Sequence, residues 1–355
     1  MQTFDKFLQG KVNDEDLAGV LVTLSKAVKQ ISNQIRTAKT CAAGTENVYG
    51  EQQLALDVLS DQLIQDECRQ NERIGLLASE ELPDELRIGD GEFAVAYDPL
   101  DGSSLVDVNL AVGSIFGVYR GQTFIGVKGD DQLSSMIAVY GPRTTIVLAV
   151  AGGEGAAGAE DTGVAATAGA SAVNEFTLVD GEFCLSKEGI KVGEGKMFAP
   201  GNLRACAERQ DYLELTNFWM KAGYTLRYSG GMVPDVNQIL LKGKGIFSYP
   251  PHSKYPEGKL RLLFECAPMA FLMEKAGGAA TDGKVRILEK PLVKLDQRTP
   301  IYIGSREEVK RCEDYLGNLG KTCSASSTSS LPTRRTTDGT VRSGVPRFLA
   351  LHRFS

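Results

Sequence analysis

Histidine is scarce in this chain, which has only two histidines in 355 residues, His252 and His352. Catalytic triads and many acid–base mechanisms depend on histidine, because its side chain gains and loses a proton near neutral pH. The second of the two lies in a Ser-, Thr- and Arg-rich C-terminal stretch, so a histidine-based triad is almost excluded. We therefore expect carboxylates to supply the catalytic groups and a metal ion to supply the electrophile.

Paired cysteines are also missing. The seven cysteines are scattered and form no Cys-x-x-Cys pair: Cys41, Cys68, Cys184, Cys206, Cys266, Cys312 and Cys323. This pattern is typical of reduced thiols in a cytosolic protein rather than of a disulfide framework or a zinc site. We expect a cytoplasmic protein, or a plastid protein if a transit peptide has been removed.

Long hydrophobic runs and an excess of basic residues are absent as well. No apolar run approaches the roughly 20 residues that a membrane-spanning helix needs, and the first residues lack the pattern of a secretory signal. The formal net charge is −6, which argues against nucleic acid or an acidic membrane surface as the main partner. We predict a small-molecule partner, with no nucleic acid and no membrane.

The hydrophobic pattern alternates between helical and strand periods along most of the chain. It predicts helices over 14–40, 51–68, 208–222, 234–242, 267–276 and 305–316, and strands over 74–78, 93–97, 113–119, 124–127, 144–150, 176–179, 182–186, 224–228, 245–249, 259–265 and 300–304. This alternation indicates an α/β or layered α+β architecture.

The order of the predicted elements and the composition together predict two domains, an insertion and a tail. We expect an N-terminal α+β domain over 1–175 and a C-terminal α/β domain over 176–320. The Ala- and Gly-rich stretch 151–172 buries little surface, so we expect a mobile insertion there. The Ser-, Thr- and Arg-rich residues 321–355 are expected to be a disordered tail.

Residues 93–104 carry the clearest chemical signal. An apolar run ends in Asp98 and Asp101, with Pro99 between them. Because proline cannot continue the hydrogen-bond ladder of a sheet, we expect the chain to turn at Pro99. Two carboxylates at a strand end form a site suited to Mg²⁺ or Mn²⁺. The Gly-Ser-Ser at 102–104 offers backbone N–H groups and hydroxyls that suit phosphate oxygens.

Taken alone, the Asp-Pro-Leu-Asp-Gly stretch is more typical of an ordinary surface turn than of a metal site. Two further acidic sites favour the functional interpretation. Glu80 and Glu81 follow an apolar run, and Glu265 lies inside the apolar run 260–267. A carboxylate in such a run is costly unless it is paired or binds a metal. Three such sites in one chain predict a shared metal–phosphate centre and phosphoryl chemistry.

The stretches around these acids resemble the fructose-1,6-bisphosphatase and sedoheptulose-1,7-bisphosphatase family of sugar phosphatases. The shared stretches span roughly residues 20–316 without the insertion: 50–57, 79–81, 98–104, 140–145, 194–202, 226–238 and 258–265. Residues 197–202 and 230–238 are more similar to the sedoheptulose branch. The resemblance implies the sugar phosphatase fold, a sandwich of alternating α-β-α-β-α layers, and a homodimer or homotetramer. It also implies that the domain over 1–175 carries the metal-binding carboxylates and that the domain over 176–320 binds the sugar phosphate.

The resemblance also implies roles for individual residues. The ligands of two or three Mg²⁺ ions, with Mn²⁺ as the alternative, would be Glu80, Glu81, Asp98, the Leu100 carbonyl, Asp101 and Glu265. Asp57, with Glu51 and Glu81 as partners, would orient or deprotonate the attacking water. The substrate's phosphates would be bound by Gly102, Ser103, Ser104, Asn202, Arg227, Tyr228, Tyr249, Lys259 and Arg261, with Arg227 reaching in from a neighbouring subunit.

These roles predict Mg²⁺-dependent hydrolysis of the 1-phosphate of sedoheptulose 1,7-bisphosphate to sedoheptulose 7-phosphate and phosphate. A fructose-1,6-bisphosphatase or a dual-specificity enzyme stays open, because the two sugars differ only in the length of the open face between their phosphates. An inositol-phosphate phosphatase shares the acidic stretch but lacks the arm with Lys259 and Arg261. A catalytically inactive sugar-phosphate sensor would be expected to have lost a metal ligand or Asp57, and none is replaced.

One departure from the family pattern predicts the response to reducing agents. The plastid sedoheptulose bisphosphatases carry a Cys-x4-Cys pair just before the Gly-Glu-Gln stretch and use it as a reducible switch. This chain has Cys41 there without a second cysteine. We therefore predict that dithiol reagents leave the activity unchanged in a phosphate-release assay, and a large reversible activation would contradict this prediction.

Overall fold

The computed structural model describes residues 1–37, 42–46, 52–152 and 172–317. Glu51 and Cys41 lie outside the described residues. The predictions of a mobile insertion and of a disordered tail also fall on residues outside these ranges, apart from the ends of the insertion.

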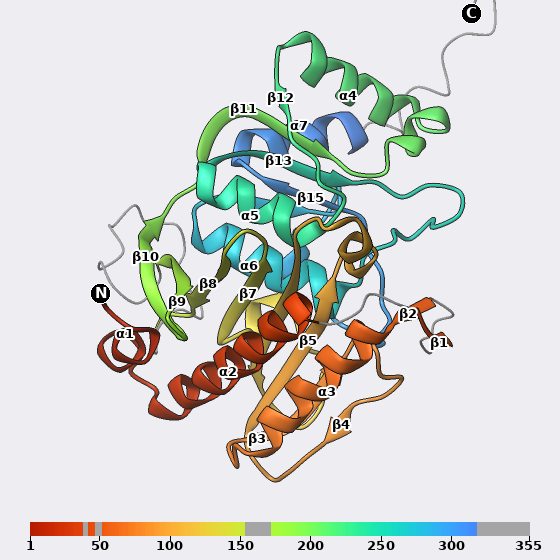
Figure 1. Cartoon of the computed structure of the whole chain (residues 1–355). Coiled ribbons are helices and arrows are strands. Elements are labelled where there is room, and N and C mark those ends of the chain that lie inside the picture. The colour runs from red at the N-terminus through yellow and green to blue at the C-terminus, as the bar shows by residue number, and fades with distance from the viewer. Residues whose placement is uncertain (38–41, 47–51, 153–171, 318–355) are drawn as a thin grey trace, which may run out of the picture. The chain divides into compact units, whose positions relative to one another are not determined.

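Eight strands form one large mixed sheet (Figure 1) in the order β10-β9-β8-β7-β6-β5-β3-β4. These strands are β3 (Ile74–Ser79), β4 (Leu86–Arg87), β5 (Phe93–Asp101), β6 (Val112–Arg120), β7 (Ser134–Tyr140), β8 (Thr144–Val150), β9 (Val173–Val179) and β10 (Glu182–Ile190). Strands β3 and β5 are parallel, and the other neighbours in this sheet are antiparallel. A two-residue hairpin loop joins β9 and β10 at Asp180 and Gly181, where φ is 49° and 83°, as such a loop requires.

Five strands form a second, smaller sheet in the order β12-β11-β13-β15-β14. They are β11 (Gly193–Pro200), β12 (Thr225–Leu226), β13 (Lys244–Tyr249), β14 (Ala279–Thr281) and β15 (Ile301–Gly304). A separate antiparallel pair consists of β1 (Ala42–Glu46) and β2 (Gln52–Leu54). The division into domains at residues 175 and 176 stays a prediction.

Helices occupy three layers around these sheets (Figure 1). One face of the large sheet packs against α1 (Phe4–Lys11), α2 (Glu15–Thr37) and α3 (Ala55–Arg69). The middle layer, between the sheets, is α5 (Met232–Lys242) and α6 (Ala267–Lys275), and the far face of the small sheet packs against α4 (Gln210–Lys221) and α7 (Arg306–Leu316). The predicted α-β-α-β-α order of layers is confirmed. No described helix is long and apolar enough to cross a membrane.

Strand β5 shows why both faces of the large sheet need a helical layer. Its residues are buried along the whole strand. Successive side chains of a strand point to opposite faces; Val95 and Tyr97 belong to the core shared with α2, and Ala94 and Ala96 to the core shared with α6. A strand buried on both faces is a continuous apolar run, and this run ends where Asp98 begins.

The predicted strand over 259–265 is wrong. Residues Leu262–Cys266 form a π-helical turn that leads directly into α6. This segment is buried among side chains of both sheets, so its hydrophobic pattern has no period that separates a strand from a helix. Glu265 therefore projects from a helical turn and not from a strand.

Two other predicted elements also differ from the structure. The strand expected over 124–127 is wrong, because the chain turns there with Gly126 at φ 94°. The helix predicted from residue 51 begins at Ala55, after β2. The other predicted elements lie within a few residues of their expected bounds, whereas the hydrophobic pattern did not indicate α1, β7, β11 or β14.

Candidate active site

A polar cavity of about 220 Å³ lies where the end of β5 meets the small sheet and the turn before α6. It brings together most of the predicted site residues: Asp57, Glu80, Glu81, Asp98, Leu100, Asp101, Gly102, Ser103, Ser104, Tyr228, Tyr249, Lys259 and Glu265. These residues come from segments as far apart in the sequence as Asp57 and Glu265, so they meet only in the folded chain.

A β-bulge brings Asp98 and Asp101 to the same cavity. Residues three apart on a regular strand point to opposite faces. In β5, Asp98 pairs with Ile115 and Asp101 with Gly113, so one extra residue is inserted between them. The strand therefore continues through Pro99, and the predicted turn at Pro99 is wrong. Side-chain hydrogen bonding holds the bulge, because the Ser114 hydroxyl donates to the Pro99 carbonyl at 2.7 Å.

Helix α5 fixes Asp101 from the other side. The backbone N–H of Val233 donates to Asp101 Oδ2 at 2.6 Å. This close approach needs a glycine on β6, since a Cβ atom on Gly113 would lie 2.3 Å from the Val233 side chain. Directly after Asp101, Gly102 has φ 75°, a conformation that favours glycine, and it leads Ser103 and Ser104 along the cavity wall.

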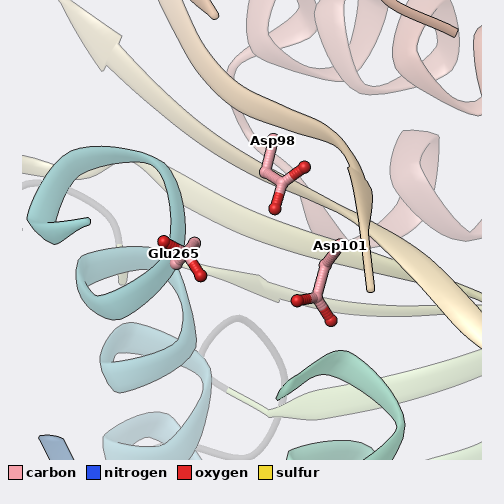
Figure 2. A group of neighbouring side chains, drawn as sticks. All are labelled: Asp98, Asp101 and Glu265. Atoms are coloured by element: carbon pink, nitrogen blue, oxygen red, sulfur yellow. The ribbon is translucent and has the colours of Figure 1, made fainter. Parts of the chain in front are cut away.

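Three buried carboxylates face one another in this cavity (Figure 2). Ligand oxygens of Asp98, Asp101 and Glu265 all lie within 4.8 Å of one another. Glu265 is held by the backbone N–H of Arg261, which donates to Glu265 Oε2 at 2.6 Å. Hard oxygen donors at this separation suit a divalent cation such as Mg²⁺ or Mn²⁺.

Burial raises the pKa of all three acids, and repulsion from neighbouring carboxylates adds to this for the two aspartates. Burial raises the pKa of Asp98 well above its ordinary value, and the charges of Asp101, Glu265 and Glu81 raise it further. Burial raises the pKa of Asp101 to about 7, although the Val233 N–H favours its charged form. Burial also raises the pKa of Glu265. Carboxylates that resist ionisation alone become stable anions beside a divalent cation, so the donor set fits a metal ion.

Arg261 is held by a carboxylate of the cavity wall. Its side chain is buried and forms an ion pair with Glu80 at the end of β3. Arg261 was expected to bind the substrate's second phosphate, yet it does not line the cavity. The physical reason is local: a buried guanidinium needs a close carboxylate, and Glu80 provides one.

Asn202 and Arg227 do not line the cavity either. Asn202 is buried at φ 51°, and its Nδ2 donates to the Pro250 carbonyl at 3.2 Å. Arg227 is exposed, and its Nη1 donates to the Leu226 carbonyl at 3.0 Å. Its neighbour Tyr228 does line the cavity. The expectation that Arg227 serves a neighbouring subunit stays a prediction.

Family models match almost the whole described chain. The N-terminal domain of fructose-1-6-bisphosphatase matches residues 3–188, and its C-terminal domain matches residues 192–317. The chain belongs to the fructose-1,6-bisphosphatase family. The predicted family is therefore confirmed, and the chain is a phosphoric monoester hydrolase of the sugar bisphosphatase type.

Individual members of the family show the same relationship. The chain is 42% identical over 318 residues to the chloroplastic sedoheptulose-1,7-bisphosphatase of Triticum aestivum, covering 88% of this chain and 76% of that protein. It is 43% identical over 315 residues to the class 1 fructose-1,6-bisphosphatase of Pelobacter propionicus, covering 87% and 90%. The crystal structure of Leishmania major fructose-1,6-bisphosphatase in holo form superposes with a TM-score of 0.79 at 31% identity, covering 89% and 98%.

Five cavity residues of this sugar bisphosphatase were not predicted: Gly230, Met232, Phe247, Leu260 and Arg298. Met232 and Phe247 also belong to the hydrophobic core, so they extend it to the cavity. Arg298 differs from them, because it adds a permanent positive charge. No local pattern in the sequence marks Arg298, since its position depends on the pairing of residues 297–299 with a segment about 37 positions earlier.

Proposed function

We propose that this enzyme hydrolyses the 1-phosphate of sedoheptulose 1,7-bisphosphate, giving sedoheptulose 7-phosphate and phosphate. One observation carries the proposal: a single cavity joins the buried carboxylate cluster to Lys259, Tyr228 and Tyr249. The carboxylates suit a metal-bound phosphate, and the ammonium group with the two phenols suits a phosphate without a metal. A substrate with two phosphates fits this division.

Asp98, Asp101 and Glu265 would hold the first Mg²⁺ ion, with Mn²⁺ as the alternative. Glu80, Glu81 and the Leu100 carbonyl line the same cavity, and we propose them as ligands for one or two further ions. When bound, the cations would neutralise phosphate charge, lower the pKa of a water molecule and stabilise the leaving alkoxide.

The chain's own residues would position the reactants and move one proton. Asp57 is buried and lines the cavity together with Glu81, so either carboxylate is placed to accept a proton from the attacking water. Glu51, the third proposed partner, lies outside the described residues. Gly102, Ser103 and Ser104 follow Asp101 along the wall, where their N–H groups and hydroxyls would orient the phosphate for an in-line displacement.

The second phosphate would be bound by Lys259, Tyr228 and Tyr249. Because Arg227 is exposed and lies outside the cavity of its own subunit, we propose that it serves a neighbouring subunit of a homodimer or homotetramer. The roles of Asn202 and Arg261 in this subsite, and the cytoplasmic location, stay predictions.

A phosphate-release assay with both bisphosphates in Mg²⁺ tests the proposed substrate. We expect kcat/KM to be about tenfold higher for sedoheptulose 1,7-bisphosphate than for fructose 1,6-bisphosphate, because one extra carbon between fixed phosphates changes the transition-state fit by about 1–3 kcal/mol. Excess chelator is the matched control and should abolish release. A higher value for the fructose substrate would identify a fructose-1,6-bisphosphatase, and equal values a dual enzyme.

A further inference from the structure

Arg298 is the second cation of the cavity. Of the described residues that line it, Lys259 and Arg298 carry positive charge, and six carry carboxylates: Asp57, Glu80, Glu81, Asp98, Asp101 and Glu265. A substrate with two phosphates enters against this acidic wall, so the placement of each cation matters for binding.

The backbone of Arg298 is fixed against the segment that carries Lys259. The N–H of Thr299 donates to the Leu260 carbonyl at 2.9 Å, and the N–H of Leu262 donates to the Gln297 carbonyl at 2.7 Å. Between these two hydrogen bonds, Arg261 and Arg298 form an antiparallel bridge. Residues 297–299 are therefore held by backbone pairing beside residues 260–262.

Gly258 brings the two segments into contact just before Lys259. It has φ 91°, and a Cβ atom there would lie 2.3 Å from the backbone carbon of Thr299. Only glycine leaves room for this approach. The close packing of Gly258 against Thr299 thus fixes the backbone at the residue before Lys259. The Lys259 side chain therefore starts from a fixed backbone position.

The side chain of Arg298 contacts both Lys259 and Tyr255. Its Nη1 donates a hydrogen bond to the carbonyl oxygen of Lys259. Its guanidinium carbon lies 5.9 Å from the centre of the Tyr255 ring. Tyr255 belongs to a turn closed by reciprocal backbone hydrogen bonds with His252. One planar guanidinium thus connects this turn to the backbone of Lys259, a combination for which arginine is better suited than lysine.

We propose that Arg298 is a positioning residue for substrate binding: it holds the Lys259 backbone and the Tyr255 turn so that the Lys259 ammonium group meets the substrate's second phosphate. This inference rests on the proposed function. Arg298 acts through Lys259, so its contribution depends on the lysine side chain being present.

A double-mutant cycle tests this dependence. Arg298→Met, Lys259→Met and the double variant are compared with the wild type for KM, kcat and the affinity for sedoheptulose 7-phosphate, measured by calorimetry in Mg²⁺. We expect Arg298→Met to raise KM and weaken product binding about tenfold, with kcat changed less than about twofold. The double variant should bind the product no more weakly than Lys259→Met alone.

Two further variants separate positioning from general structural damage. Arg298→Lys keeps a charge and one donor, so it should recover part of the lost affinity. Arg306→Met is the matched control, because Arg306 is exposed and its Nε donates to the Gly277 carbonyl at 3.0 Å, away from the cavity. This control should bind the product as the wild type does.

The outcomes are distinct. Unchanged product binding in Arg298→Met would overturn the inference, and so would additive losses in the double variant, which would indicate that Arg298 acts independently of Lys259. Calorimetry needs no turnover, so wild-type product binding without hydrolysis of either bisphosphate would overturn the proposed function alone. A wild type that does not bind sedoheptulose 7-phosphate would overturn both.

Discussion

Asp98→Asn is expected to lower kcat by at least about a thousandfold, which corresponds to about 4 kcal/mol of lost transition-state stabilisation. Asp98 is one of three carboxylates whose oxygens lie within 4.8 Å of one another. An amide keeps the size and one acceptor oxygen but removes the negative charge that would bind the cation. The backbone should be undisturbed, because the remaining oxygen can still accept the Leu100 N–H, which donates to Asp98 Oδ1 at 2.9 Å.

Thermal unfolding separates this loss from misfolding. Without metal, Asp98→Asn should unfold at or above the wild-type temperature, because burial and neighbouring carboxylates already disfavour the charged form of Asp98 and raise its pKa. Asp211→Asn is the matched control: Asp211 is also a buried aspartate, but it lies at the start of α4 and outside the cavity. Its kcat should stay within about twofold of wild type. Retained turnover in Asp98→Asn would refute the metal assignment.

The acidic half of the site could be predicted because its signal is local. A carboxylate directly after or inside an apolar run is unusual in any fold. Asp98 directly follows such a run and Glu265 lies inside one, and Glu81 and Asp101 lie within a few residues of an apolar run. The alternation of helices and strands likewise depends on neighbours in the chain. The α-β-α-β-α layering required the resemblance to the family in addition.

The geometry of the site could not be predicted, because it depends on contacts between distant segments. Proline usually ends a central strand, but the hydrogen bond from Ser114 to Pro99 lets β5 continue through a bulge. The positions of the cationic side chains could not be predicted for the same reason. Arg261 matches a substrate-binding position in the family pattern, yet in three dimensions Glu80 is its partner and Arg298 lies on the cavity wall.

The metal-free enzyme is expected to lose stability as the pH rises from about 4 to about 7, and Mg²⁺ is expected to restore stability at pH 8. The sign follows from Asp101, whose pKa is raised from 3.8 to about 7 in the folded protein by burial. Below pH 3.8 the group is protonated in both states, so its full contribution is present. Between pH 3.8 and pH 7, Asp101 is ionised in the unfolded chain but stays protonated in the folded chain, so the folded state becomes less stable relative to the unfolded state. Once the pH has risen through 7, the stabilisation that Asp101 contributes at low pH is lost.

The expected loss is large because the acids act together. A pKa difference of about 3 corresponds to about 4 kcal/mol for Asp101 alone, and burial raises the pKa of Asp98 and Glu265 in the same direction. A bound cation reverses this preference, because it stabilises the charged carboxylates and competes with their protons. Mg²⁺ should therefore raise the unfolding temperature strongly at pH 8 and only weakly at pH 5.

Thermal unfolding at pH 5 and pH 8, with chelator or with Mg²⁺, measures this effect. Other buried acids with raised pKa values, such as Asp61 and Asp235, contribute to the pH dependence of the metal-free protein. Asp101→Asn isolates the cluster, since it should reduce both the loss of stability between pH 5 and pH 8 and the gain from Mg²⁺. A metal-free wild type that is equally stable at both pH values, or a variant that responds to Mg²⁺ as the wild type does, would show that these carboxylates do not form the metal site.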